Sequence, residues 1–244
     1  SYSGNTEEVV DGYRQAREKG FPLAVVSVGG ELLKLARADG VPCVEMPDTG
    51  IQPRSALGFS MKGILKLMGK ELSLEELSRL AGSLNPAEYE ERGKALAGRM
   101  KNFVPVIYAS SRNAGVAANW KIKLNETAKI PAFYNVFPEL NHNEMTGFDA
   151  QDTTRALVKH FFFLFLKDAG DGARILKRMD VTKKLLSDRG FPCEIVELEG
   201  NDPFTKIFSS LVLADWIAYY TGVGYGLETE QVPMVEEFKK LIAS

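Results

Sequence analysis

Apolar and polar positions along this chain alternate between the period of a helix and the period of a buried strand. Apolar residues have helical spacing over residues 6–19, and the nearly continuous apolar run at 22–28 predicts a buried strand. After Gly29-Gly30, residues 31–38 again have helical spacing, and residues 41–46 predict a second strand. Strand, helix and strand at this pitch predict right-handed βαβ units and a parallel sheet.

The same alternation returns in the second part of the chain. A helix-rich stretch at 55–82 precedes Leu84-Asn85-Pro86, which favours a linker because its proline ends one helix and can open the next. Beyond it the pattern predicts strands at 104–109, 132–137, 161–166 and 193–198, and helices at 87–100, 116–127, 173–189, 203–220 and 232–243. Both parts contain a Ser-rich turn, so we entertain an internal duplication, although the two parts share little sequence identity.

Composition and charge narrow the class of protein. A chain of 244 residues with 45% hydrophobic and 25% charged residues fits one large globular domain or two of ordinary size. The net charge of −2 gives no basic field for nucleic acid or an anionic membrane, so neither partner is expected. The longest strongly apolar run, at 161–166, is too short to cross a bilayer.

The two cysteines, Cys43 and Cys193, lie far apart, and each follows a proline at the start of an apolar segment. They fit buried reduced thiols better than a disulfide or a metal site. This pattern predicts a reducing environment, and we expect a cytoplasmic protein.

The first six residues, Ser1-Tyr2-Ser3-Gly4-Asn5-Thr6, combine hydroxyl, glycine and amide residues directly before a predicted helix. Such a segment can cap the helix and turn its N–H and hydroxyl donors toward an anion, typically a phosphate. The segment begins without an initiator methionine and without a preceding strand. We therefore expect the chain to be the remainder of a longer protein whose N-terminal part is missing.

One of the two histidines, His142, lies in the polar loop 138–144 directly after a predicted strand. Open α/β sheets bind their ligands at this position, and an imidazole can transfer a proton near neutral pH. A loop histidine hydrogen-bonded to the adjacent asparagines fits the same residues equally well. The other histidine, His160, precedes an apolar run and is interpreted as a residue at the edge of a strand.

Glu126 and Arg54 are two further candidates. Glu126 lies near the C-terminal end of a predicted helix, where the negative end of the helix dipole favours proton uptake by a carboxylate, as a general base requires. From the residues alone, a surface glutamate paired with Lys123 or Lys129 is the favoured interpretation. Arg54 follows a turn containing Pro53, where an arginine can bind an oxyanion or simply remain solvated.

Four motifs at residues 1–6, 53–56, 125–130 and 138–143 read Ser-Tyr-Ser-Gly-Asn-Thr, Pro-Arg-Ser-Ala, Asn-Glu-Thr-Ala-Lys-Ile and Pro-Glu-Leu-Asn-His-Asn. In these motifs, and over essentially its whole length, the chain resembles the bifunctional phosphoglucose/phosphomannose isomerases, which have two sugar-isomerase (SIS) domains. The first motif alone indicates only a phosphosugar-binding SIS domain, whereas the Asn-Glu and Asn-His-Asn motifs are more specific.

The resemblance implies an α/β fold of two doubly wound, Rossmann-like SIS domains with parallel sheets. The first domain, at residues 1–86, is expected to be incomplete. The second, at residues 87–244, is expected to end in a helix that returns to the active site. Ser1, Ser3 and Thr6 match the loop that holds the sugar phosphate.

The resemblance also implies catalytic roles for four residues. Arg54 matches an arginine that stabilises the charged intermediate, and Glu126 matches the carboxylate that carries a proton between C1 and C2. His142 matches the histidine that helps open the sugar ring and is contributed across a dimer interface. Lys239 matches a C-terminal lysine that reaches the same site.

The implied activity is isomerisation of glucose 6-phosphate and mannose 6-phosphate with fructose 6-phosphate through a cis-enediol, in glycolysis and gluconeogenesis. The implied enzyme is a homodimer and needs no metal or other cofactor. A non-catalytic SIS module that senses a phosphosugar explains the N-terminal motif equally well but gives Glu126 and His142 no role. The isomerase half of an amidotransferase that makes glucosamine 6-phosphate would require a glutaminase domain in the missing part.

Overall fold

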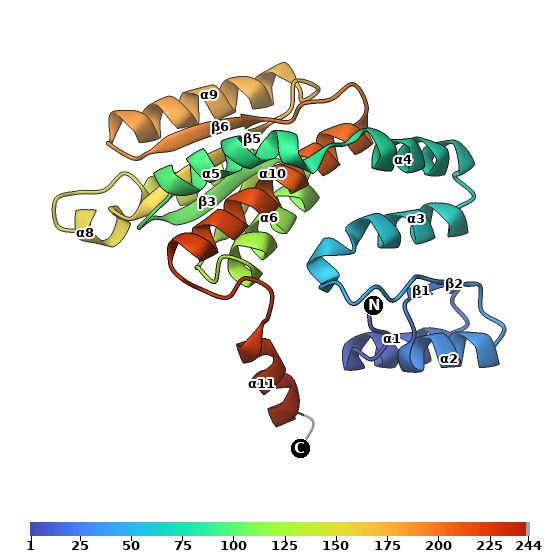
Figure 1. Cartoon of the computed structure of the whole chain (residues 1–244). Helices are drawn as coiled ribbons and strands as arrows, with labels where there is room; N and C mark the ends of the chain where they lie inside the picture. The colour runs from blue at the N-terminus through green and yellow to red at the C-terminus, as the bar shows by residue number, and fades with distance from the viewer. Residues whose placement is uncertain (243–244) are drawn as a thin grey trace. The chain divides into compact units, whose positions relative to one another are not determined.

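The computed structural model describes residues 1–242 and divides the chain into two compact units, Ser1–Ser83 and Leu84–Ser244 (Figure 1). Each unit contains a sheet, and the strands that pair within the described residues pair in parallel. The predicted α/β fold with parallel sheets is therefore confirmed.

Unit 1 contains the parallel pair β1 (Val25–Ser27) and β2 (Cys43–Glu45), joined through helix α2 (Gly30–Ala38). Helix α1 (Glu7–Glu18) packs with α2 over this pair. Both strands are shorter than the apolar runs predict. The side chains that form the core of this part share helical or strand spacing in the sequence and are Val10, Tyr13, Val25, Leu32, Leu33 and Ala36.

The rest of unit 1 is helical. A short turn of 3₁₀ helix, η1 (Pro53–Ser55), leads into α3 (Leu57–Leu67) and α4 (Glu71–Ser83). Helix α3 approaches β1 closely, because a Cβ atom at Gly63 would lie 2.7 Å from a methyl carbon of Val26. The absence of a side chain at Gly63 is what permits this contact.

Unit 2 has a sheet of four parallel strands in the order β4-β3-β5-β6. The strands are β3 (Val104–Ser110), β4 (Phe133–Phe137), β5 (Phe161–Lys167) and β6 (Cys193–Glu197). Strand β3 is central, with Ile107 opposite both Tyr134 and Leu164. Since the chain moves from β3 to one neighbour and then crosses to the other, the loops at the carboxyl ends of β3 and β5 diverge.

Helices cover both faces of this sheet (Figure 1). Helix α9 (Ala173–Asp188) packs on the face formed by alternate residues of β3 and β5, namely Val106, Tyr108, Phe163 and Phe165. The other face carries α6 (Ala114–Glu126), which packs against α10 (Pro203–Gly224), and α10 packs in turn against α5 (Glu90–Arg99). The remaining short elements and the last helix are η2 (Pro86–Tyr89), η3 (Ser111–Asn113), η4 (Glu139–Asn141), α7 (Glu144–Gly147), α8 (Arg155–Val158) and α11 (Pro233–Ile242).

Polar contacts fix α6 against α10. Trp120 is fully buried, and its indole N–H donates to the hydroxyl of Ser210 at 2.9 Å. Lys123 is 2% exposed, and its ammonium group donates to the carboxylate of Asp215 at 2.5 Å. A buried ammonium group is tolerated only with such a partner, so this pair fixes the rotation of α6 and hence the place of its last turn.

The cysteines are less buried than predicted. Cys43 and Cys193 are both free, in agreement with the reduced state expected, but each is only partly buried. Each is the first residue of a strand at the edge of its sheet, which leaves one side of the residue uncovered. Burial nevertheless raises the pKa of the Cys193 thiol. The last residue of the helix predicted at 232–243, Ala243, lies outside the described residues.

A pair of glycines in α5 tests the packing of unit 2. A Cβ atom at Gly93 would lie 2.4 Å from the Cβ atom of Trp216 in α10, whereas a Cβ atom at Gly98 would meet no atom within 4 Å. We expect Gly93→Ala to lower the free energy of unfolding by about 1–3 kcal/mol, because the two helices must separate. Gly98→Ala should leave it unchanged or raise it by at most about 1 kcal/mol.

Urea unfolding followed by tryptophan fluorescence measures both variants, and it reports on unit 2 because both tryptophans of the chain, Trp120 and Trp216, lie there. Equal stability of the two variants would contradict the close contact between α5 and α10.

Candidate active site

The hydroxyl groups at the start of unit 1 gather in one loop before α1. The hydroxyl groups of Ser1 and Thr6 lie 2.8 Å apart and share a hydrogen bond. The hydroxyl of Ser1 also accepts from the N–H of Gly4 at 3.2 Å, and that of Ser3 accepts from the N–H of Asn5 at 3.2 Å. Thr6 is the N-cap residue of α1, but its side chain makes no capping hydrogen bond. The first turn of α1 therefore keeps donors available for an anion.

This loop is held against the start of α2. The carbonyl of Gly4 accepts from the N–H of Leu32 at 2.9 Å, and the side-chain oxygen of Asn5 accepts from the N–H of Glu31 at 2.9 Å. The carbonyl of Tyr2 accepts from the N–H of Val28 at 2.9 Å, directly beyond β1. These contacts hold the loop against α2, whereas the hydroxyl groups of Ser1 and Ser3 bond only within the loop.

Gly4 permits this arrangement. Its φ angle is +75°, and a Cβ atom there would lie 1.9 Å from the carbonyl oxygen of Gly29. A side chain is excluded both by the left-handed backbone and by the close approach of the two chain segments.

Arg54 also belongs to unit 1. It lies in η1, directly after Pro53, and only 9% of its surface is exposed. A guanidinium group is rarely so buried unless it has partners, so Arg54 is not the solvated arginine that one alternative predicts.

Glu126 is the last residue of α6 in unit 2, and it is partly buried. The ammonium group of Lys123 donates to Asp215, and that of Lys129 donates to the backbone carbonyl of Glu126 itself. The side chain of Asn125 donates to the carbonyl of Ile130 at 3.0 Å, which fixes the turn after the helix. Each of the two lysines named in the surface-pair alternative thus donates to an acceptor other than the Glu126 carboxylate, and the turn that carries Glu126 is well defined.

His142 is exposed and follows η4, in the loop after β4. Its neighbours hold the backbone on both sides. The amide group of Asn141 donates to the hydroxyl of Thr182 in α9 at 2.8 Å. Two residues after the histidine, Glu144 accepts at one oxygen from the Tyr108 hydroxyl at 2.7 Å and at the other from the amide of Asn135. An exposed imidazole on a fixed backbone suits proton transfer to a ligand.

The sequence names Glu144 as part of a polar loop but does not reveal this anchoring role. Tyr108 is 1% exposed, and burial together with the hydrogen bond to Glu144 raises the pKa of its hydroxyl. The phenol therefore keeps its proton and remains a donor to the carboxylate of Glu144. One feature of the sequence could have indicated this contact. Tyr108 lies within an otherwise apolar strand, and a buried hydroxyl group requires a hydrogen-bond partner.

Lys239 lies in α11, and its ammonium group donates to the carboxylate of Glu236 at 2.7 Å. None of the described side chains of α11 is buried. The structure thus brings Ser1 and Thr6 together and places Ser3 and Arg54 in the same unit. Glu126, His142 and Lys239 lie on three separate elements of unit 2.

Within residues 1–242, no group of three or more histidine, cysteine, aspartate or glutamate side chains is arranged to hold a metal ion. Within the same residues, no helix combines the length and the apolar character that a membrane span requires.

Comparison with known proteins decides the family. Residues 89–242 match the family model of the bacterial phospho-glucose isomerase C-terminal SIS domain. The chain is 32% identical over 240 residues to a bifunctional phosphoglucose/phosphomannose isomerase of Aquifex aeolicus. The matched residues make up 98% of this chain and 73% of the relative. The chain belongs to the bifunctional phosphoglucose/phosphomannose isomerase family.

A second member of this family, from Caldicellulosiruptor bescii, is 33% identical over 257 residues and covers all of this chain and 75% of the relative. Among solved structures, a glucosamine-6-phosphate deaminase of Thermotoga maritima superimposes with a TM-score of 0.69 at 18% identity, over 96% of this chain and 71% of that protein. At this identity the superposition shows a shared fold only. The SIS fold expected from the motifs is confirmed.

The glycine in the N-terminal loop gives a first test of this site. We expect Gly4→Ala to lower the free energy of unfolding by about 2–4 kcal/mol, because strain from the positive φ adds to the clash with Gly29. Gly20→Ala is the matched control, since Gly20 has a φ angle of +69° but a Cβ atom there would meet nothing within 4 Å. Gly20→Ala should lower the free energy of unfolding by only about 1–2 kcal/mol.

Far-UV circular dichroism in urea measures the free energy of unfolding of both variants. Equal losses in the two variants would contradict the close approach of the loop to Gly29.

The anchor of the histidine loop gives a second test. Glu144→Gln replaces one acceptor oxygen by an amide group, which then faces a donor. We expect the free energy of unfolding, measured by tryptophan fluorescence in urea, to fall by about 1–3 kcal/mol. Glu139→Gln is the control in the same loop, because Glu139 is exposed and its contact with Asn143 survives the change. It should change stability by less than about 0.5 kcal/mol. Comparable effects of the two changes would rule out the anchoring role.

Proposed function

We propose that this chain is an aldose–ketose isomerase that interconverts glucose 6-phosphate and mannose 6-phosphate with fructose 6-phosphate. The observation that carries the proposal is the similarity to bifunctional phosphoglucose/phosphomannose isomerases over 98% of the chain and 73% of a relative. Unit 1 is then part of the first SIS domain, and unit 2 is the second SIS domain. It places the enzyme in the cytoplasm, in the hexose phosphate reactions of glycolysis and gluconeogenesis.

The phosphate of the sugar binds to Ser1, Ser3 and Thr6 in this proposal. Their hydroxyl groups gather before α1, and contacts with the start of α2 hold the loop that carries them. Hydroxyl and N–H donors at a helix N-terminus bind a phosphate without requiring a cation. Binding at the phosphate fixes the distant C1 and C2 atoms and reduces the entropy lost in the reaction.

The reaction itself needs three functions, namely ring opening, proton transfer between C2 and C1, and stabilisation of negative charge. His142 helps open the sugar ring by proton transfer. Glu126 removes the proton from C2, which is acidified by the neighbouring carbonyl, and returns it to C1 through a cis-enediol. Arg54 stabilises the negative charge that develops on the enediolate oxygens. Lys239 reaches the same site from α11. The well-defined turn at the end of α6, which carries Glu126, supports its part.

The proposed enzyme is a homodimer in which His142 of one chain acts on the sugar bound by the other. The exposure of His142 and the fixed backbone around it support this part of the proposal. A non-catalytic SIS module that senses a phosphosugar remains the competing function, since it needs the hydroxyl loop but neither Glu126 nor His142.

A coupled assay on the full-length protein tests the proposal, with glucose 6-phosphate and mannose 6-phosphate as substrates. We expect Glu126→Gln to lower kcat by a factor of roughly 10²–10⁴ with little change in KM, because the change removes the base and leaves phosphate binding intact. Glu91→Gln, an exposed glutamate of α5, is the control and should leave both constants unchanged.

Unchanged turnover in the Glu126→Gln variant would remove Glu126 as the base. A wild-type protein that binds these sugars and turns over neither of them would instead establish the sensing function.

A further inference from the structure

The second Ser-rich turn of the chain has no part in the proposed reaction. It comprises residues 110–113, after β3, and it faces residues 168–171, after β5. A cavity of about 330 Å³ lies beside these turns, and its lining includes Arg112, Asn113, Asp168 and Lys206. Because the chain leaves β3 toward β4 and leaves β5 in the opposite direction toward β6, the loops after β3 and β5 diverge, and parallel α/β folds bind ligands at such a point.

A carboxylate of the chain itself, that of Asp168, lines this cavity and binds the donors around it. Asp168 is 2% exposed. One of its oxygens accepts from the ammonium group of Lys206 at 2.6 Å and from the N–H of Gly170 at 2.8 Å. The other oxygen accepts from the amide group of Asn113 at 3.5 Å. An ammonium group, a backbone N–H and an amide are the donors that proteins commonly offer to a bound phosphate or carboxylate.

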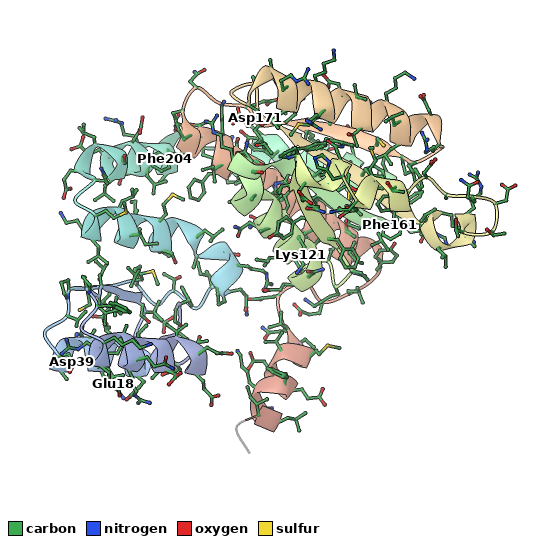
Figure 2. The ribbon with its side chains drawn as sticks, turned by 180° about the vertical axis from the view of Figure 1, so that it is seen from behind. Glu18, Asp39, Lys121, Phe161, Asp171 and Phe204 are labelled. Carbon is green, nitrogen blue, oxygen red and sulfur yellow. The ribbon has the colours of Figure 1, made fainter. Side chains whose placement is uncertain are left out.

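The hydroxyl group of Ser110 in this turn is also bound by groups of the chain itself. Ser110 donates to one oxygen of Asp171 at 2.9 Å and accepts from Asn113 at 3.1 Å. Asp171 lies just beyond the carboxyl end of β5 (Figure 2). Its second oxygen is buried and has no hydrogen-bond partner in the part of the chain that the structure describes. The crevice thus already holds two carboxylates, and a third anion would meet repulsion rather than free donors.

Unit 1 differs in this respect. The hydroxyl groups of Ser1 and Thr6 bond to each other, and that of Ser3 accepts from the loop backbone. No carboxylate among residues 1–242 bonds to these three hydroxyl groups. The Ser-rich turn of unit 1 is therefore open to an anion, whereas that of unit 2 is filled.

The charges around Asp168 agree with an ionised carboxylate. Burial raises its pKa, but the hydrogen bonds from Lys206, Gly170 and Asn113, together with the charge of Lys206, lower the pKa below its ordinary value. The other charged groups nearby are Arg112, whose guanidinium donates to the carbonyl of Gly170 at 2.8 Å, Asp171, and Asp202, which caps α10.

We propose that the carboxylate of Asp168 is a built-in anion that fills the ligand position of unit 2 and closes it to phosphate esters. Removal of this carboxylate creates a site for a small oxyanion such as formate, held by Lys206, Gly170 and Asn113. The occupied site restricts binding of the sugar's phosphate group to unit 1, and only this last consequence rests on the proposed function.

Chemical rescue tests the proposal without any sugar. Thermal unfolding of unit 2 is followed by tryptophan fluorescence in sodium formate and in sodium chloride of equal ionic strength. We expect Asp168→Ala to lower Tm by roughly 10 °C in chloride, because Lys206 loses its buried partner. Formate should restore at least about half of this loss in a saturable way, beyond any change that it causes in the wild type.

The matched control is Asp180→Ala. Asp180 pairs with Lys167 at 2.7 Å, but its side chain is 54% exposed. Its loss should change Tm little and should show no specific response to formate. If formate and chloride act equally on the Asp168→Ala variant, or if the wild type and the Asp180→Ala variant respond to formate as strongly as that variant, the proposal is overturned.

A second variant tests the proposal even if the Asp168→Ala variant does not fold in either salt. Asp168→Asn keeps the shape of the side chain and removes its charge. Because the pKa of Asp168 is lower in the folded protein than in the unfolded chain, its stabilisation is present above the unfolded pKa and is lost as the pH falls through the folded pKa. The Asn variant should lack this part of the acid dependence. Identical acid dependence in the wild type and the variant would show that Asp168 is not held as an anion.

Discussion

The parallel pairing of β3 with both β4 and β5 is the constraint on which the rest of unit 2 depends. Parallel strands end at the same edge of a sheet, so the loops that follow these strands all begin there. Those loops carry the second Ser-rich turn, the histidine loop and the turn that contains Asp168. The sheet also supplies an anchor, because Tyr108 of β3 reaches across to Glu144 beside His142. The packed strands β3 and β5 thus set the positions of the polar groups in these loops.

Polar pairs, each with at least one buried member, then fix these helices and loops. Lys123 with Asp215 sets the rotation of α6, Glu144 with Tyr108 holds the histidine loop, and Asp168 with Lys206 closes the crevice of unit 2. Each pair satisfies a group that would be costly to bury alone, so each specifies one conformation more strongly than it adds net stability. Unit 1 uses a different device, in which Gly4 and backbone hydrogen bonds hold the loop against the start of α2.

Local pattern was sufficient to predict most helices and strands, because helix and strand period are properties of neighbouring residues. The helices α1, α6 and α9 begin and end within two residues of the predicted positions. The motifs around Glu126 and His142 were sufficient to predict the family. Contacts between distant residues were not predictable in this way. The pairs of Tyr108 with Glu144 and of Asp168 with Lys206 join residues separated by 36 and 38 positions, and only the order of strands in the sheet brings them together. The partial exposure of Cys43 and Cys193 likewise follows from the edge positions of their strands, which apolar spacing does not reveal.

The central claim is that Glu126 of one chain and His142 of another act on the same sugar. Co-expression of a Glu126→Gln chain with a His142→Gln chain tests it most directly. In a mixed dimer, one of the two sites combines the intact glutamate of one chain with the intact histidine of the other. Random pairing should then restore about a quarter of the wild-type isomerase activity, although each variant alone is nearly inactive. Activity in the mixture no higher than the mean of the two separate variants would contradict the claim.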